Sequence, residues 1–176
     1  MSYKYEDLVE ETRKLMVAEL EADIASKSLH VNEWVQDEHH DTYIELLKSA
    51  LQSGTEFDLE QEVRSKGILK ERYTWHRPDG RTATVKVPEM AAKNLACGDF
   101  NRFYMRAICL KAKSQKQKEA TVYRAMKTEH HMLESNSKVG NPVEVDELMK
   151  SLKRGESLES YLRLPPGPIS GLTIKV

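Results

Sequence analysis

Long apolar runs and secretion features are absent from this chain of 176 residues. No apolar stretch approaches the roughly 20 residues that a membrane-spanning helix needs. The first residues, MSYKYEDLVEETRK, lack the basic start and the apolar core of a signal peptide. We therefore expect a soluble, cytoplasmic (intracellular) protein with no membrane partner.

Cysteine is scarce, since Cys97 and Cys109 are the only two in the chain. Without a secretion signal, reduced thiols are expected and a structural disulfide is not. Basic residues lie near Cys109 in the sequence, and they would lower the pKa of its thiol. The sequence places no histidine beside this thiol, so we do not expect it to act as a nucleophile.

Catalytic and metal-binding motifs are also missing. The adjacent pairs His39-His40 and His130-His131 could meet His76 in space, but neighbouring histidines on a helix point about 100° apart. No Cys-x-x-Cys or His-x-x-x-His spacing supports a metal site. The carboxylates in EDLVEE and QDEHHD are typical of a solvated acidic helix face. We therefore expect no metal and no cofactor, and no motif supports an enzymatic activity.

Charge is divided unevenly along the chain, although the net charge is only −1. Residues 1–63 carry five basic and 16 acidic side chains, residues 64–127 carry 16 basic and five acidic, and residues 128–176 carry six basic and seven acidic. The like charges of the middle third repel one another unless something negative lies against them. That partner is either a phosphate backbone or the acidic residues 1–63, on the same chain or on a neighbouring subunit.

The length suits a single domain, residues 1–176, with a core of its own. Its acidic third is predicted to be helical. Apolar residues at three- and four-residue spacing predict a first helix from about residue 3 to residue 26. A second helix is expected over 41–52, where the Asp41 side chain caps its start and Gly54 supplies a left-handed stop.

The basic third, residues 64–127, changes to the period of a strand. Before it, Asp58 and Gln61 form a capping-box pattern for a short third helix that ends near Gly67. Two runs rich in β-branched and aromatic residues then flank Pro-Asp-Gly, where Pro78 sets a turn and Gly80 takes a positive φ. This pattern predicts a β-hairpin.

After the hairpin, glycine and proline predict further boundaries. Pro88 suits the first turn of a short helix through Ala96, Gly98 ends that helix, and Asp99 caps another that runs to Lys113. A strand over 120–126, ATVYRAM, follows a polar link. The middle third therefore reads as a ββαβ unit.

The last third, residues 128–176, reads as a C-terminal helix and an extended Pro/Gly tail. Pro142 stands at the predicted helix start and Gly155 lies past its end, with a helical turn expected around 158–162. Prolines keep the start of the tail from forming helix, whereas LTIKV at the end can pair at a sheet edge. The fold class predicted is α+β, with the tail docked on the rest of the chain or on a neighbour.

The predicted helix over 99–113 has two different sides. At 100° per residue, Phe100, Phe103, Tyr104 and Ile108 gather on one side, which predicts that these rings and this aliphatic side chain are core. Arg102, Arg106, Cys109 and Lys113 gather on the other side, which we expect to face solvent.

The charge pattern predicts a non-enzymatic binding module whose basic segment binds DNA or RNA. The alternative is a structural subunit of a larger assembly, such as a phage or viral particle, that associates through complementary acidic and basic surfaces. An enzyme without a recognisable motif is the third reading. The residues predicted to form one polyanion-binding surface are Arg72, Arg77, Arg81, Lys86, Arg102, Arg106, Lys113, Lys116 and Lys118.

Overall fold

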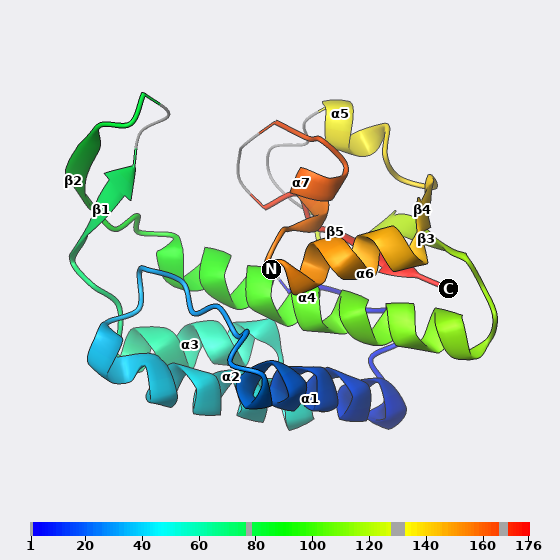
Figure 1. Ribbon diagram of the computed structural model, residues 1–176, viewed down its shortest axis with the longest axis horizontal. Helices are drawn as coiled ribbons and strands as arrows, with labels where there is room; N and C mark the ends of the chain where they lie inside the picture. The colour runs from blue at the N-terminus through cyan, green and yellow to red at the C-terminus, as the bar shows by residue number, and fades with distance from the viewer. Residues whose placement is uncertain (1, 77–78, 128–132, 166–168) are drawn as a thin grey trace.

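Helix α4 (Ala91–Ser114) runs through the centre of the molecule, and the other elements pack around it (Figure 1). The computed structural model describes residues 2–76, 79–127, 133–165 and 169–176. Mixed helix and antiparallel strand make the architecture α+β, as predicted. The helices packed along one side of α4 are α1 (Glu10–Ala25), α2 (His40–Ser53) and α3 (Glu56–Lys66).

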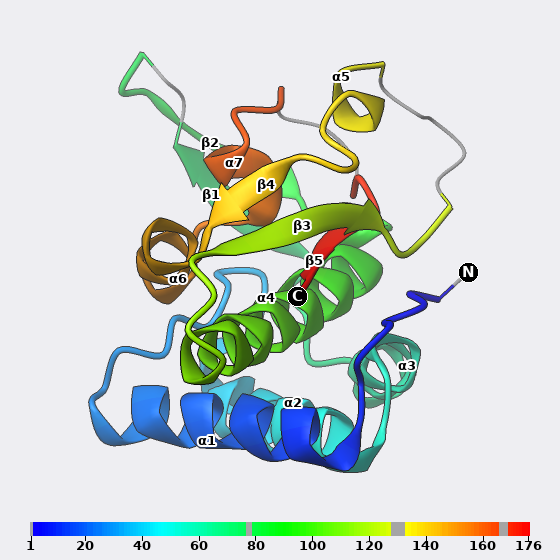
Figure 2. The same cartoon turned by 90° about the vertical axis from the view of Figure 1, so that its right-hand side faces the viewer.

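A three-stranded antiparallel sheet lies on the opposite side of α4 (Figure 2). Its central strand β3 (Glu119–Arg124) pairs with β4 (Pro142–Glu144) on one side and with β5 (Leu172–Lys175) on the other. In this register Val122 lies opposite Ile174, and both are fully buried. The predicted sheet pairing of the C-terminal segment LTIKV is therefore confirmed.

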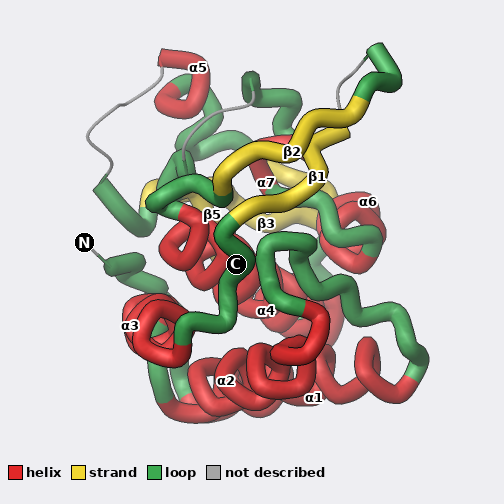
Figure 3. Tube along the Cα trace, turned by 90° about the vertical axis from the view of Figure 1, so that its left-hand side faces the viewer, coloured by secondary structure: helices red, strands yellow, loops and turns green. Residues whose placement is uncertain are grey.

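The predicted β-hairpin is present as β1 (Arg72–His76) and β2 (Thr82–Lys86). It extends away from the helices beside the start of α4 (Figures 1 and 3). Gly80 has a φ of 80°, as the turn chemistry predicted. Pro78, which was expected to set the turn, lies outside the described residues.

Helix α4 is continuous where the sequence predicted two helices. Gly98 and Asp99 were expected to end one helix and cap the next, but both lie inside α4. Leu95 and Phe100, on either side of the glycine, are buried in the same core. A helix break would remove one of them from that core, and a helical glycine costs only about 1 kcal/mol relative to alanine.

Helix α1 begins at Glu10 and not near residue 3. The preceding residues are extended and dock on the rest of the chain. The Lys4 backbone N–H donates to the Ala125 carbonyl at 2.8 Å, and the Tyr5 ring lies 4.3 Å from the Tyr104 ring, centroid to centroid. These tertiary contacts override the helical period of the sequence.

Three of the predicted helix boundaries are wrong and one is confirmed. Asp41 does not cap α2, which begins one residue earlier, and Gly54 has a φ of −96°, outside the left-handed region. The capping box that starts α3 is formed by Thr55 and Asp58 and not by Asp58 and the residue three positions later. Helix α3 ends at Gly67, as predicted, and the structure gives this glycine a left-handed φ of 61°.

Near the C-terminus, Pro142 begins strand β4, and helix α6 (Val145–Lys153) starts only after it. The helical start predicted at Pro142 is therefore wrong by three residues, because the proline joins the edge of the sheet. Gly155 has a φ of 84° just beyond α6. The remaining short helices are η1 (Asp37–His39), α5 (Leu133–Asn136) and α7 (Leu158–Tyr161).

The aromatic side of α4 forms the centre of the hydrophobic core. Phe100, Phe103, Tyr104 and Ile108 have no exposed surface, so the core prediction is confirmed. None of the helices described here has both the length and the apolar character needed to cross a membrane.

Candidate polyanion-binding surface

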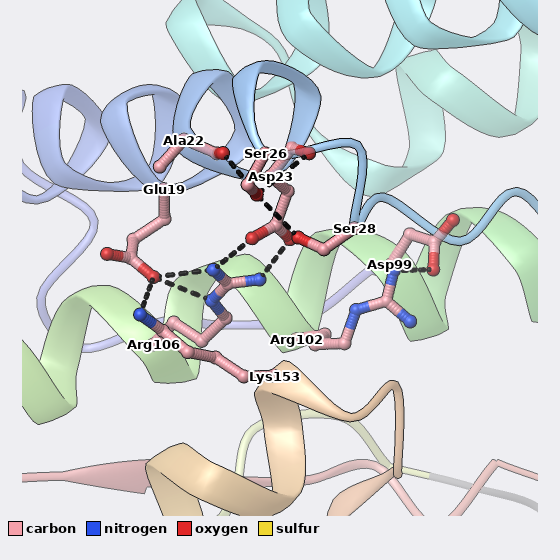
Figure 4. A network of polar contacts seen from close by, with 9 residues as sticks. All are labelled: Glu19, Ala22, Asp23, Ser26, Ser28, Asp99, Arg102, Arg106 and Lys153. Atoms are coloured by element: carbon pink, nitrogen blue, oxygen red, sulfur yellow. Dashed lines mark hydrogen bonds and ion pairs between the residues drawn. The ribbon is translucent and has the colours of Figure 1, made fainter.

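Arg106 lies in the interior, between α4 and α1 (Figure 4). Its guanidinium donates to Glu19 Oε2 from Nε at 2.8 Å and from Nη2 at 2.6 Å, and to Asp23 Oδ2 from Nη1 at 2.5 Å. Burial alone would lower the Arg106 pKa, but the hydrogen bonds with Asp23 and Glu19 outweigh it and raise the pKa. Only 1% of this side chain is exposed. The prediction that Arg106 faces solvent is therefore wrong.

On the side of α4 expected to be solvated, Lys113 is exposed as predicted, but the other three residues are covered by other elements. Arg102 is mostly buried and forms an ion pair with Asp99 at 2.8 Å. Cys109 is completely buried, and burial raises the pKa of its thiol to about 12, against the predicted lowering. The helical period identified one buried side correctly, but α4 is central and is packed on more than one side.

The other residues predicted to bind a polyanion belong to segments at the two ends of α4 (Figure 1). Arg72, Arg81 and Lys86 belong to the hairpin beside its first residue. Lys113 is in its last turn and pairs with Asp146 at 2.6 Å, and Lys116 and Lys118 follow in the link to β3. A helix of 24 residues is about 36 Å long. The structure therefore does not bring these side chains together on one surface, and Arg77 lies outside the described residues.

Acidic and basic thirds of the sequence pair within the one chain. Besides the Arg106 cluster, Lys111 lies 2.5 Å from an oxygen of Asp7, and Lys70 lies 2.8 Å from an oxygen of Asp37. These pairs neutralise part of the positive charge of residues 64–127 without any external partner. The hairpin retains Arg72 and Lys86 with no ion pair among the described residues.

The two faces of the hairpin differ in chemistry. One face carries three cross-strand pairs, Arg72 with Lys86, Thr74 with Thr84 and His76 with Thr82, and all six side chains are exposed. Threonine hydroxyls and basic side chains are interspersed along this face, which we call the basic face. Because every second residue of a strand lies on the same face, the basic face could have been found from the sequence of the two strands. The charge summed over residues 64–127 does not distinguish these exposed residues from the buried arginines of α4.

The opposite face of the hairpin is apolar. Tyr73 lies across from Val85, and Trp75 lies across from Ala83. The Trp34 ring meets the Tyr73 ring edge to face, with centroids 6.1 Å apart, and joins the hairpin to the body. Trp75 is 42% exposed, which is high for so large an apolar side chain.

No metal centre accompanies this surface: among the residues with described positions, no three histidine, cysteine, aspartate or glutamate side chains gather in a way that could hold an ion. Comparisons of the chain with protein-family models, with curated proteins and with solved structures find no match.

Proposed function

We propose that the protein binds nucleic acid through the basic face of the hairpin. The observation that carries this proposal is the exposure of all six side chains on that face, two of them cations without an ion pair in the described part of the chain. Lysine, arginine and hydroxyl side chains are the usual donors to phosphate oxygens. A two-stranded ribbon also has the dimensions to enter the major groove of B-DNA.

The proposed surface is smaller than the one predicted from the sequence. Arg72 and Lys86 remain in it and Arg81 lies next to it in the turn, whereas Arg106 is committed to the interior and Arg102 to Asp99. Arg81 already bonds Asp79, so its phosphate contact competes with an exposed ion pair of low strength. With about three phosphate contacts, binding is expected to be weak, non-specific and strongly dependent on salt.

A salt titration of single variants tests the proposal. Labelled duplex DNA and single-stranded RNA are titrated with wild type, with Arg72→Ala and with Lys86→Ala, from about 50 to 200 mM salt. Each variant should lower affinity without regard to base sequence and reduce the slope of log affinity against log salt by about one. The matched control is Lys116→Ala with Lys118→Ala, which removes exposed positive charge at the far end of α4 and should leave the slope unchanged.

Two results contradict the proposal. One is the absence of binding by the wild type at the lowest salt concentration. The other is an equal loss of affinity in the hairpin variants and in the control, because that result would indicate attraction to general charge and not to the basic face.

A structural subunit of an assembly is the second candidate, and the apolar face of the hairpin favours it. An isolated two-stranded hairpin with Trp75 exposed gains stability when a neighbour covers that face. The basic face would then meet exposed carboxylates of residues 1–63 on the next subunit, such as Glu38 and Glu45. Salt-sensitive self-association without nucleic acid, lost in Trp75→Ser, supports assembly. A monomer at every salt concentration argues against it.

A further inference from the structure

The outer edge of strand β2 is open along the hairpin. Strand β2 pairs with β1 alone, and no other strand borders it within the described ranges. The opposite edge of the hairpin lies against the body, because the Lys70 backbone N–H donates to the Trp34 carbonyl at 2.8 Å just before β1 begins. An unpaired strand edge is a template for another strand. The hairpin can therefore be extended at β2.

The hydrogen bonds of the hairpin determine which backbone groups of β2 face outward. The Val87 N–H donates to the Glu71 carbonyl at 2.9 Å, so these two opposite residues form a hydrogen-bonded pair. Bonded and non-bonded pairs alternate along an antiparallel ladder. Counted from that pair, the residues of β2 on the basic face direct their N–H and C=O groups away from β1. These residues are Thr82, Thr84 and Lys86.

The edge of β2 complements a second copy of itself. A two-fold axis at Thr84 places Thr84 opposite Thr84 of the second copy and Lys86 opposite the second copy's Thr82, so the outward groups of all three residues find partners. The two Lys86 side chains are then four residues apart along the strands, about 13 Å, which exceeds the screening length of about 8 Å at physiological salt. Antiparallel pairing therefore avoids a lysine opposite a lysine.

The apolar faces of the two hairpins also meet in this register. Ala83 lies opposite Val85 of the second copy, and Trp75 and Tyr73 flank this pair on β1 of each copy. One apolar surface of four strands then replaces two surfaces of two strands each. A two-stranded hairpin is only marginally stable, whereas three or more strands with an apolar face are stable.

The basic faces join on the opposite side of the extended sheet. Arg72 and Lys86 of each copy together place four cations on one surface, twice the number that a single hairpin offers on its basic face. These like charges oppose pairing in the free protein. A phosphate backbone along the joined face neutralises them, so nucleic-acid binding and pairing favour each other.

We propose that two copies of this protein pair through the outer edge of β2 when they bind nucleic acid. This pairing rests on the proposed function, because the polyanion removes the repulsion that keeps free copies apart. The contact consists of two short strands and is far smaller than a stable protein–protein interface. The free protein is therefore a monomer, and the second copy binds cooperatively beside the first on the nucleic acid.

Binding stoichiometry tests the cooperativity. A labelled DNA duplex of two helical turns, about 20 bp, is titrated with the protein at low salt, and the complexes are counted by native mass spectrometry. The second copy should bind about tenfold more tightly than the first. Equal and independent binding of the two copies overturns the pairing and leaves the proposed function intact, whereas the absence of any binding overturns both.

A cysteine at the two-fold axis tests the geometry. Opposite residues of a hydrogen-bonded pair have Cα atoms about 5.5 Å apart, a separation that a disulfide can span. Thr84→Cys should therefore give a cross-linked dimer with oxidised glutathione when the duplex is present. The matched control is Thr74→Cys, which lies opposite Thr84 on the same face but on β1, and it should not cross-link. The natural Cys97 and Cys109 are buried.

Proline variants test the backbone hydrogen bonds. Thr84→Pro removes an outward N–H of β2, a change that an edge strand tolerates, and Thr74→Pro makes the same change on β1. Both variants lose one hydroxyl of the basic face, so the affinity of the first copy should fall alike in the two. Only Thr84→Pro should lose the tenfold preference for the second copy.

Thermal unfolding shows whether each proline variant is folded, and the cysteine variants decide the question if one is not. Equal cross-linking of Thr84→Cys and Thr74→Cys refutes pairing through β2. Undiminished cooperativity in a folded Thr84→Pro refutes it as well.

Discussion

Replacing Arg106 with methionine should destabilise the protein more than any surface charge change. The guanidinium is the main partner of two carboxylates whose side chains are only 12% and 14% exposed, those of Glu19 and Asp23. Removing one member of such a buried group leaves uncompensated charge in the interior and costs about 3–5 kcal/mol. At about 2–4 °C per kcal/mol for a chain of this size, Tm should fall by roughly 6–20 °C.

Urea denaturation followed by circular dichroism measures this loss. The triple variant Arg106→Met, Glu19→Gln, Asp23→Asn removes the stranded charges and should recover more than half of it, because uncharged side chains cost far less to bury. Lys48→Met is the matched control. It breaks the Lys48–Glu21 pair between α2 and α1, whose side chains are 39% and 55% exposed, and should cost less than about 1 kcal/mol.

A loss of less than about 1 kcal/mol in Arg106→Met would refute this reasoning. It would mean that water reaches Glu19 and Asp23 and that the guanidinium is free to turn outward. Arg106 would then return to the set of phosphate-binding candidates.

Three further results are expected from the same structure. Gly98→Ala should stabilise the protein by about 0.5–1 kcal/mol, whereas Gly171→Ala should destabilise it strongly. At Gly171 the added Cβ would meet a backbone oxygen at 2.2 Å, and the φ there is 73°. Urea titration compares the two variants, and similar effects on stability would contradict the backbone argument. Burial raises the thiol pKa values of Cys97 and Cys109 from 9.0 to about 12, so the thiolate fraction at pH 8 falls about a thousandfold. A thiol reagent should therefore react with these cysteines only after unfolding. Rapid reaction of the native protein would disprove this burial. Deleting residues 172–176 removes β5, whose first three residues are buried, and should lower Tm or prevent folding; unchanged melting would show that the strand is not needed.

The hairpin could be predicted from the sequence because its signals are local. Pro-Asp-Gly supplies the turn, and the β-branched and aromatic residues on either side favour strands. The end of α3 at Gly67 and the apolar side of α4 were predicted for the same reason: each depends on residues a few positions apart. The basic face of the hairpin also follows from alternation in the sequence, once the strands are known.

Other features depended on distant segments of the chain. Residues 3–5 have a helical period but are extended, because the sheet offers a backbone acceptor at Ala125 and α4 offers the Tyr104 ring. Gly98 and Asp99 have the chemistry of a helix boundary, yet the core on both sides of them keeps α4 continuous.

By itself, the sequence determined the α+β class, the hairpin and the separation of acidic from basic charge, since these depend on composition and short-range pattern. Only the tertiary structure decided which charges remain exposed to solvent and which meet each other. Arg106 and Glu19 are 87 positions apart, so no local pattern relates them, and an arginine on a helix looks the same in the sequence whether water or another helix covers it. Burial between α1 and α4 makes Arg106 part of the core, and projection from the body leaves Arg72 and Lys86 exposed, because the desolvation of a charge depends on its neighbours in space and not on its neighbours in the chain.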